Sequence, residues 1–208
     1  IFSQLRDTKR AIRYFREALQ LSEPEDKDEI FLDLAMEYEN SNDYAGAILV
    51  LEEAIKYNPN NEVAIYEIAF CYDQSGEYQK AIQCYSDFIE ENPYSFTAWY
   101  NLGNAYSKLE NWEQAIWAYD YCVVINEDFS PAYFNLGNAY LSLDKFQLSI
   151  ENFEKCMSID GEDGLALCYI GECQEQLGNY ELAKHYYYRS LEFVADLPEA
   201  WLGLGIVS

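Results

Sequence analysis

Large apolar residues recur along this chain every three or four positions, and short polar turns interrupt them at regular intervals. Between residues 99 and 119 they form two groups: Trp99, Leu102, Tyr106 and Leu109, then Trp112, Ala115, Ile116 and Tyr119. This spacing places each group on one face of a helix, so the segment predicts two amphipathic helices joined by a turn. Similar segments end at Asn58-Pro59 and Asn92-Pro93, where proline lacks the amide that a continuing helix needs.

The two-helix pattern returns every 34 residues. The stretch AWYNLGNAY at 98–106 reappears as AYFNLGNAY at 132–140. Steps of 34 residues give a large apolar column (Phe31, Ile65, Trp99, Tyr133, Leu167, Trp201) and a small-residue column (Ala35, Ala69, Gly103, Gly137, Gly171, Gly205). Small residues let two helix backbones approach closely, while aromatic residues fill the space between turns. A fixed period of this length predicts stacked structural repeats.

These columns resemble those of the tetratricopeptide repeat, which has Trp, Leu-Gly, Tyr, Ala, Phe and Pro positions at the same period. AWYNLGNAY is similar to the first helix of that family, and NWEQAIWAYDYCVVI to the second. The resemblance covers essentially the whole chain and implies an all-α, right-handed superhelical solenoid of antiparallel helix pairs. The departures are modest: Gln174 replaces a Tyr, Ser149 replaces an Ala, and the terminal Pro is lost at Glu127, Gly161 and Ala195.

The repeat boundaries follow from the columns, and we expect one solenoid over residues 1–208. Five complete repeats are predicted at 28–61, 62–95, 96–129, 130–163 and 164–197. Residues 1–27 correspond to the second helix of a partial repeat plus a linker that is two residues longer, in the turn SEPEDKD. Residues 198–208 correspond to the first helix of a truncated repeat. Natural arrays end in polar capping helices, so we expect the chain to be a fragment of a longer protein.

The charge balance narrows the choice of partners. The chain has 37 acidic and 13 basic side chains, a formal net charge of −24. Such a surface repels phosphate backbones and anionic lipids, so neither nucleic acid nor a membrane surface is an expected partner. Basic residues gather on the first helix: Arg6, Lys9, Arg10, Arg13 and Arg16. This helix is predicted to expose a solvated outer face, or alternatively to dock on the acidic body of another copy.

No catalytic, cofactor or metal motif is present in the sequence. The six cysteines form no C-x-x-C pair and the single histidine, His185, has no paired nucleophile, so neither a zinc site nor a catalytic site is predicted. The turn IDGEDG lacks the ligand spacing of an EF-hand, and no phosphate-binding loop occurs. We therefore predict a non-enzymatic chain with no cofactor. Its cysteines are interpreted as buried thiols in a reducing compartment, which predicts a cytoplasmic location.

The resemblance also implies a binding surface, because the first helix of each repeat lines the concave side in this family. Residues of these helices outside the packing columns form the predicted peptide-binding groove: Tyr66, Glu67, Phe70, Tyr100, Asn101, Asn104, Phe134, Asn135, Asn138 and Tyr169. An Asn side chain offers one acceptor and two donors, which match the amide groups of an extended peptide. The four asparagines are expected to point away from the fold. Alternatively, they reflect helix packing or solubility.

The groove also lacks a feature found in some relatives. Family members that clamp the terminal carboxylates of heat-shock chaperones use Lys and Arg on these columns. Here Lys108 is the only basic residue on the first helices of the complete repeats, so a carboxylate clamp is not expected. Acidic residues toward both ends of the groove favour a neutral or basic segment.

A second surface is predicted on the helix that follows Asn111. Trp117, Tyr121 and Val124 have i, i+4, i+7 spacing where other second helices are polar. Exposed Trp and Tyr side chains are typical interface anchors, so this stripe predicts self-association or a second partner. The alternative is that a neighbouring side chain covers it.

Taken together, these features predict a scaffold or adaptor that binds an extended neutral or basic peptide segment of a protein partner in the concave groove. Two alternatives remain. The chain is the recruiting or regulatory arm of a larger enzyme, or it is a self-assembly module that uses the Trp117 stripe.

Overall fold

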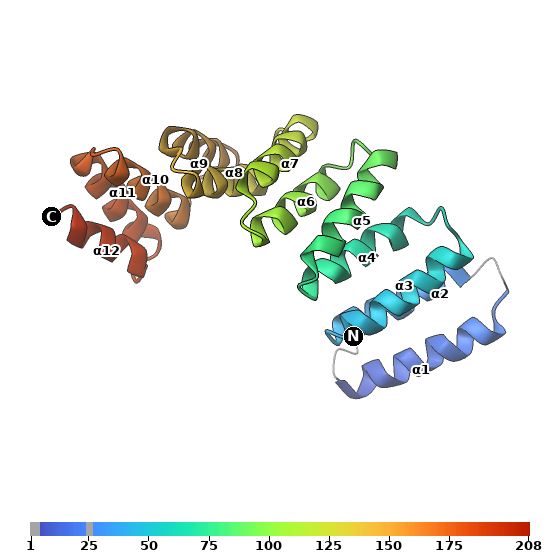
Figure 1. Ribbon diagram of the computed structural model, residues 1–208. Coiled ribbons are helices and arrows are strands. Elements are labelled where there is room, and N and C mark those ends of the chain that lie inside the picture. Colours follow the sequence, from blue (N-terminus) through green and yellow to red (C-terminus); the bar gives the residue numbers. More distant parts are fainter. Residues whose placement is uncertain (1–4, 24–26) are drawn as a thin grey trace. The chain divides into compact units, whose positions relative to one another are not determined.

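The computed structural model describes residues 5–23 and 27–208, and for residues 5–7 the backbone alone. Over this part of the chain the structure contains twelve α-helices and no strand (Figure 1). Their bounds are α1 Leu5–Leu21, α2 Lys27–Asn40, α3 Tyr44–Tyr57, α4 Glu62–Gln74, α5 Tyr78–Glu91, α6 Phe96–Lys108, α7 Trp112–Ile125, α8 Ser130–Ser142, α9 Phe146–Asp160, α10 Gly164–Gln176, α11 Tyr180–Phe193 and α12 Pro198–Ile206. The predicted all-α fold with two helices per repeat is confirmed.

Side-chain caps explain why several first helices begin where they do. The Asn61 side chain accepts a hydrogen bond from the Ala64 amide at 3.0 Å, and Asp163 accepts one from the Ala166 amide at 2.8 Å. Each cap satisfies an amide that has no partner within its own helix. Ser95 has the corresponding role at the start of α6.

The turn from first to second helix uses the same backbone conformation in the five helix pairs from α2–α3 to α10–α11. One residue per turn has a positive φ, between 56° and 79°. These residues form a further column at the 34-residue period: Asn42, Gly76, Glu110, Asp144 and Gly178. Glycine adopts this conformation without a steric cost and Asn or Asp at a modest one. The chain therefore turns at the same point of each repeat whichever residue stands there.

The helices group into two compact units, residues 1–94 and 95–208. In the first unit, each helix from α1 to α5 packs on the next along the chain, and α2 also contacts α4. In the second, the same sequential packing runs from α6 to α12, and α10 also contacts α12. This stacking is that of a helical-repeat solenoid. The repeat boundaries and the single solenoid over 1–208 stay predictions.

The small-residue column lies against aromatic rings of the paired second helix. A Cβ on Gly103 would lie 2.4 Å from Cε1 of Tyr119, and one on Gly137 would lie 2.7 Å from Cε1 of Phe153. Tyr119 and Phe153 are fully buried. The glycines are therefore required because the rings occupy the volume that a side chain would need.

The two polar departures from the family pattern are satisfied inside the fold. Ser149, which replaces an alanine, donates its hydroxyl hydrogen bond to the Gly137 carbonyl at 2.8 Å. Gln174, which replaces a tyrosine, accepts a hydrogen bond from the Asn179 side chain at 2.9 Å. Neither substitution leaves a buried polar group without a partner. The longer linker predicted in SEPEDKD includes residues 24–26, which lie outside the described residues, as does the side chain of Arg6.

Candidate functional site

The candidate groove residues lie on the first helices at half-buried positions outside the fully buried columns, and we call this surface the first-helix face. In the unit 95–208 this face is formed by α6, α8 and α10. The predicted residues there are all half-buried: Tyr100, Asn101, Asn104, Phe134, Asn135, Asn138 and Tyr169. In the unit 1–94, α4 places Tyr66, Glu67 and Phe70 in half-buried positions.

The groove aromatics rest on buried rings of the second helices. Phe134 lies edge-on to Phe153 at 5.4 Å between ring centroids, and Tyr169 stacks on the same ring at 5.4 Å. The rings of Tyr100 and Tyr119 are tilted toward each other, with 5.9 Å between their centroids. Because one side of each ring packs inward, these residues belong both to the core and to the surface.

The asparagines do not share one role, and the prediction that all four point away from the fold is wrong for two of them. Asn135 Nδ2 donates to Asn104 Oδ1 at 2.9 Å and to the Tyr100 hydroxyl at 3.3 Å. The Tyr119 hydroxyl also donates to Asn104 Oδ1, at 2.8 Å. This network joins α6, α7 and α8 across a repeat boundary. Asn104 and Asn135 therefore stabilise the fold.

Asn138 occupies the same column as Asn104 but has a different neighbour. Phe153 stands one repeat after Tyr119, and it has no hydroxyl group to donate. Asn138 instead lines an open pocket. The exchange of Tyr for Phe in that column is the sequence signal that distinguishes the two asparagines.

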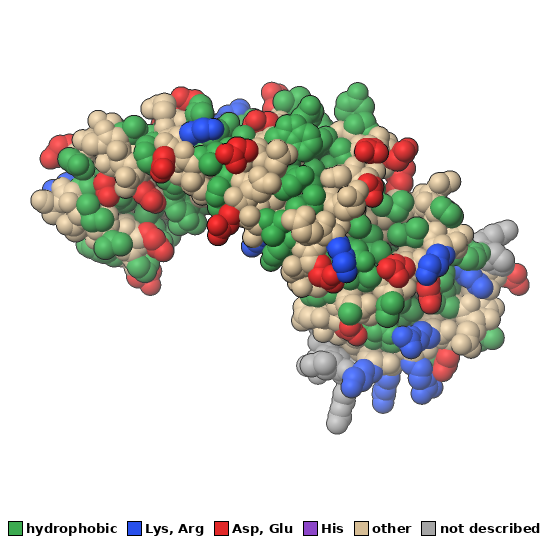
Figure 2. All heavy atoms as spheres, in the orientation of Figure 1, with side chains coloured by type: hydrophobic (Ala, Val, Ile, Leu, Met, Phe, Trp, Pro, Cys, Tyr) green, Lys and Arg blue, Asp and Glu red, His purple; other side chains and the backbone are tan. Residues whose placement is uncertain are grey.

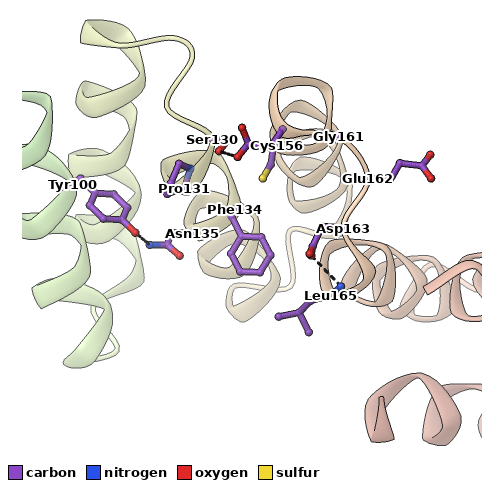
Figure 3. Close-up of a pocket in the computed structure, with 11 residues that line it drawn as sticks. Tyr100, Ser130, Pro131, Phe134, Asn135, Cys156, Gly161, Glu162, Asp163 and Leu165 are labelled. Atoms are coloured by element: carbon purple, nitrogen blue, oxygen red, sulfur yellow. Dashed lines mark hydrogen bonds between the residues drawn. The ribbon is translucent and has the colours of Figure 1, made fainter. Parts of the chain in front are cut away.

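One pocket on α8 and α10 lies beside the amino ends of these helices, and we call it the amino-end pocket. Its volume is about 470 Å³. Figure 3 shows the side chains that surround it: Tyr100, Ser130, Pro131, Phe134, Asn135, Cys156, Asp160, Glu162, Asp163 and Leu165, with the backbone of Gly161. Here α9 continues to Asp160 and the chain turns at Gly161 with φ of 90°. Glycine tolerates that conformation readily.

The carboxylates around the amino-end pocket have partners within the chain. Ser130 donates a hydrogen bond to Asp160, and Arg189 forms a salt bridge with Glu162. Asp163 accepts hydrogen bonds from two backbone amides at the start of α10. These carboxylates are therefore engaged within the chain, and the Tyr100 and Phe134 rings with Leu165 supply the apolar walls of this pocket.

The second pocket lies beside the carboxyl ends of α8 and α10, and we call it the carboxyl-end pocket. Its volume is about 530 Å³. It is lined by Asn138, Leu141, Ser142, Asp144, Phe146, Tyr169, Glu172 and Gln176. Burial, and then the charge of Glu175, raises the pKa of Glu172. The Tyr187 hydroxyl donates to Glu175 at 2.8 Å. No Lys or Arg lines this pocket among the described residues, so its charge is negative.

Acidic groups also gather on the first-helix face of the unit 1–94. Burial raises the pKa of Glu39 and of Glu67, and the charge of Glu39 raises that of Glu67 further. Cys71 Sγ donates to Glu39 Oε1 at 3.4 Å.

The first helices carry one more basic residue than the sequence predicted. Helix α2 begins at Lys27, so Lys27 as well as Lys108 lies on a first helix. The Nζ atom of Lys27 lies 6.0 Å from the Tyr57 ring centroid.

The aromatic stripe on α7 has an internal role that the sequence did not indicate. Tyr121 stacks on Trp99 with 4.5 Å between centroids, and Trp117 meets Trp99 edge-on at 5.1 Å. The two rings thus cover Trp99, which is 7% exposed. Trp117 and Tyr121 nevertheless remain 42% and 46% exposed, and Val124 is 80% exposed. Figure 2 shows hydrophobic side chains gathered over α7. The stripe therefore packs against Trp99 and also forms part of the exposed surface.

The other predicted features are placed as follows. His185 is exposed beside the ring of Tyr186. Five cysteines are buried and Cys84 is half-buried, and burial raises the pKa of Cys173 to about 11. Among the described residues, no group of three metal-ligating side chains converges, and no helix is both long and apolar enough to span a membrane. Basic side chains gather over α1 in Figure 2.

Family models account for most of the chain. A tetratricopeptide repeat model matches residues 1–24, 130–163 and 166–193. A second model, described as anaphase-promoting complex, cyclosome, subunit 3, matches residues 40–122. No curated protein sequence matches the chain.

Solved structures share the fold. A crystal structure of MamA is 28% identical, with a TM-score of 0.76 over 80% of this chain and 91% of that one. A tetratricopeptide repeat protein from Parabacteroides merdae is 16% identical, with a TM-score of 0.78 over 86% and 72% of the two chains. The thermophilic repeat protein TTC0263 from Thermus thermophilus is 17% identical, with a TM-score of 0.60 over 86% and 98%. The helix pairs, the 34-residue columns and these matches show that the chain belongs to the tetratricopeptide-repeat family, a family of protein–protein interaction scaffolds.

Proposed function

We propose that the chain binds an extended neutral or basic peptide segment of a partner protein on its first-helix face. The observation that supports this most directly is the pair of pockets formed by α8 and α10. One has mainly apolar walls, and the other has amide and carboxylate walls. A segment that contacts both gains apolar burial at one point and polar contacts at the other.

The dimensions suit a short extended segment. Helix α8 has 13 residues and is therefore about 20 Å long at 1.5 Å per residue. An extended chain advances about 3.3 Å per residue, so about six residues reach from one pocket to the other. Asn138, and the Oδ1 atom of Asn135, offer polar atoms toward such a backbone. The net charge of −24 disfavours an acidic segment.

The other proposed contacts extend the same surface. In the unit 95–208 they are Tyr100, Asn101, Asn104, Phe134 and Tyr169, and in the unit 1–94 they are Tyr66, Glu67 and Phe70. The buried thiols fit a reducing compartment, and we propose the cytoplasm as the place where binding occurs.

A peptide selection tests this proposal. A random dodecapeptide library displayed on phage is selected against the wild-type chain, and the enriched peptides are synthesised and measured by fluorescence anisotropy. Asn138→Trp fills the carboxyl-end pocket with a large side chain, while Glu154→Trp places the same side chain on the exposed face of α9. We expect Asn138→Trp to weaken binding about tenfold or more, since excluded volume removes the contacts there, and Glu154→Trp to leave it unchanged. Equal affinities for all three proteins would contradict the proposal.

A second surface is supported by the exposure of the α7 stripe. We propose that Trp117, Tyr121 and Val124 contact another protein, with a second copy of this chain as one form of that contact. Val124 gives the cleaner test because it is 80% exposed, whereas Trp117 covers Trp99. If the stripe joins two copies, Val124→Glu lowers the molar mass measured by light scattering at high concentration. A wild-type mass that equals one chain at all concentrations would remove self-association.

A further inference from the structure

We infer that the carboxyl-end pocket binds a basic side chain, Arg or Lys, of the partner segment. This inference rests on the proposed function and adds a specificity to it, since it assigns a charge to one position of the segment. Four features of the pocket support it: its carboxylates, its helix ends, its aromatic rings and its amide oxygens.

The carboxylates of this pocket differ from those of the amino-end pocket in having no internal cation. Asp144 and Glu172 form neither a salt bridge nor a side-chain hydrogen bond with any residue that the structure describes. In the amino-end pocket, by contrast, Arg189 pairs with Glu162 and a hydroxyl group pairs with Asp160. An incoming cation would therefore be the first counter-charge at the carboxyl end.

Three helix ends meet at the pocket: the carboxyl ends of α8 and α10, and the amino end of α9, which begins at Phe146. Two carboxyl ends outnumber one amino end, so the helix ends together add to its negative potential. Helix α8 ends at Ser142 and α10 ends at Gln176, and both residues line the pocket. The carboxyl end of a helix carries the equivalent of about half a negative charge, because its last carbonyl groups have no partners within the helix. The amino-end pocket is adjacent to the opposite ends of the same two helices and to the carboxyl end of α9. The helix ends therefore favour a cation less at that pocket than at the carboxyl-end pocket.

The remaining walls fit the rest of a long basic side chain. The rings of Phe146 and Tyr169 and the side chain of Leu141 offer apolar surface to its methylene groups. The ring faces also attract a guanidinium or ammonium group. Asn138 and Gln176 supply amide oxygens that can accept its hydrogen bonds.

The nearest lysine in the sequence does not fill this role. Lys145 follows Asp144 directly, but its Nζ lies 5.9 Å from the centroid of the Tyr140 ring. Lys145 does not line the pocket. The pocket is therefore open to a cation from outside the chain.

A double-mutant cycle tests the inference. Peptides from the selection that carry Arg are resynthesised with citrulline, which keeps the shape of the side chain and removes its charge. Each pair is measured against the wild-type chain and against Asp144→Asn/Glu172→Gln. We expect citrulline to weaken binding about tenfold on the wild type, in the range of charge pairs at interfaces, and about twofold or less on the variant. For Lys-containing peptides, acetyl-lysine replaces citrulline.

Glu151→Gln/Glu154→Gln is the matched control. It also removes two negative charges, but from the exposed face of α9 and not from the pocket. It should respond to citrulline as the wild type does, and circular dichroism should be unchanged in both variants. Selected peptides without a basic residue at a fixed position, or an equal citrulline effect on all proteins, would overturn this inference alone. A library that yields no peptide would overturn the proposed function and this inference with it.

One competing occupant is the basic α1 helix of a second copy. In that case sedimentation would show an association that Asp144→Asn/Glu172→Gln abolishes, and the selected peptides would compete with it poorly. That result would place the basic side chain on a second copy of this chain and would overturn its assignment to an extended partner segment.

Discussion

Asn104 accepts two hydrogen bonds from residues of neighbouring helices, one from Tyr119 and one from Asn135. We predict that Asn104→Ala lowers the free energy of unfolding by about 1–2 kcal/mol, because the Asn135 amide loses an acceptor and the buried Tyr119 hydroxyl keeps only Ser107 Oγ, at 3.1 Å, as a partner. Asn138→Ala, in the same column of the next repeat, should change it by about 0.5 kcal/mol or less. Urea unfolding followed by circular dichroism gives both values. Equal effects of the two substitutions would show that the network does not stabilise the fold.

The cysteine thiols should differ in reactivity according to their burial. Burial raises the pKa of Cys122 and of Cys168 to about 12, so these thiols stay protonated at neutral pH and react slowly, because the thiolate is the nucleophile. We predict that a thiol reagent at pH 8 modifies the half-buried Cys84 first. All six cysteines should react after unfolding in denaturant. Cys84→Ser should remove the fast phase, and a fast phase that persists would contradict the assignment.

At the residue scale, the sequence predicted where the groove residues lie better than what they contact. Spacing placed Asn104 and Asn138 in the same column, on the first helices α6 and α8. Their different roles depend on whether a Tyr or a Phe stands opposite, on another helix. The covering of Trp99 by Trp117 and Tyr121 was missed for the same reason, since it depends on side-chain directions between two helices.

Among the elements, the fit of first helix against second helix is set by the small-residue column. We predict that Gly103→Ala destabilises the protein by about 1–3 kcal/mol, because the new methyl group would overlap the buried Tyr119 ring. Gly205 stands in the same column, but a Cβ there meets nothing within 4 Å. Gly205→Ala should therefore stabilise helix α12, by up to about 1 kcal/mol. Thermal unfolding of the two variants checks the opposite signs, and a stabilising Gly103→Ala would contradict the packing.

The helices themselves were predictable from the sequence, because the apolar period and the helix-ending prolines agree. The pockets were not. The amino-end pocket depends on one extra residue of α9 and on the positive φ of Gly161, where the family pattern has a proline. The carboxyl-end pocket depends on the distance between two helix ends from different repeats. Neither feature recurs at the 34-residue period, so the repeat pattern in the sequence could not predict the pockets.

For the whole molecule, the excess of acidic groups should make stability depend on pH. Burial raises the pKa of Glu39, Glu67 and Glu172 above the ordinary value for glutamate. The folded state then holds these protons more tightly than the unfolded chain, so the free energy of unfolding rises as the pH falls toward the raised pKa values. We predict a higher urea midpoint at pH 5.5 than at pH 7.5.

Variants and salt separate the causes of this dependence. Glu39→Gln/Glu67→Gln should make the protein more stable at pH 7.5 and flatten its pH dependence, because the mutual repulsion is gone. Added salt should raise the midpoint at pH 7.5 in the wild type by screening the net charge. A midpoint that is the same or lower at pH 5.5 would contradict the prediction.

The division at residues 94 and 95 has a spectroscopic consequence. All four tryptophans, Trp99, Trp112, Trp117 and Trp201, belong to the unit 95–208, whereas helices occur in both units. Tryptophan fluorescence therefore reports the melting of one unit only, while ellipticity reports both. In an array whose repeats contact only their neighbours, cooperativity depends on the interfaces between them. Coincident melting curves would mean that helices α1–α5 and α6–α12 unfold together. Separate curves would mean that the two units unfold independently.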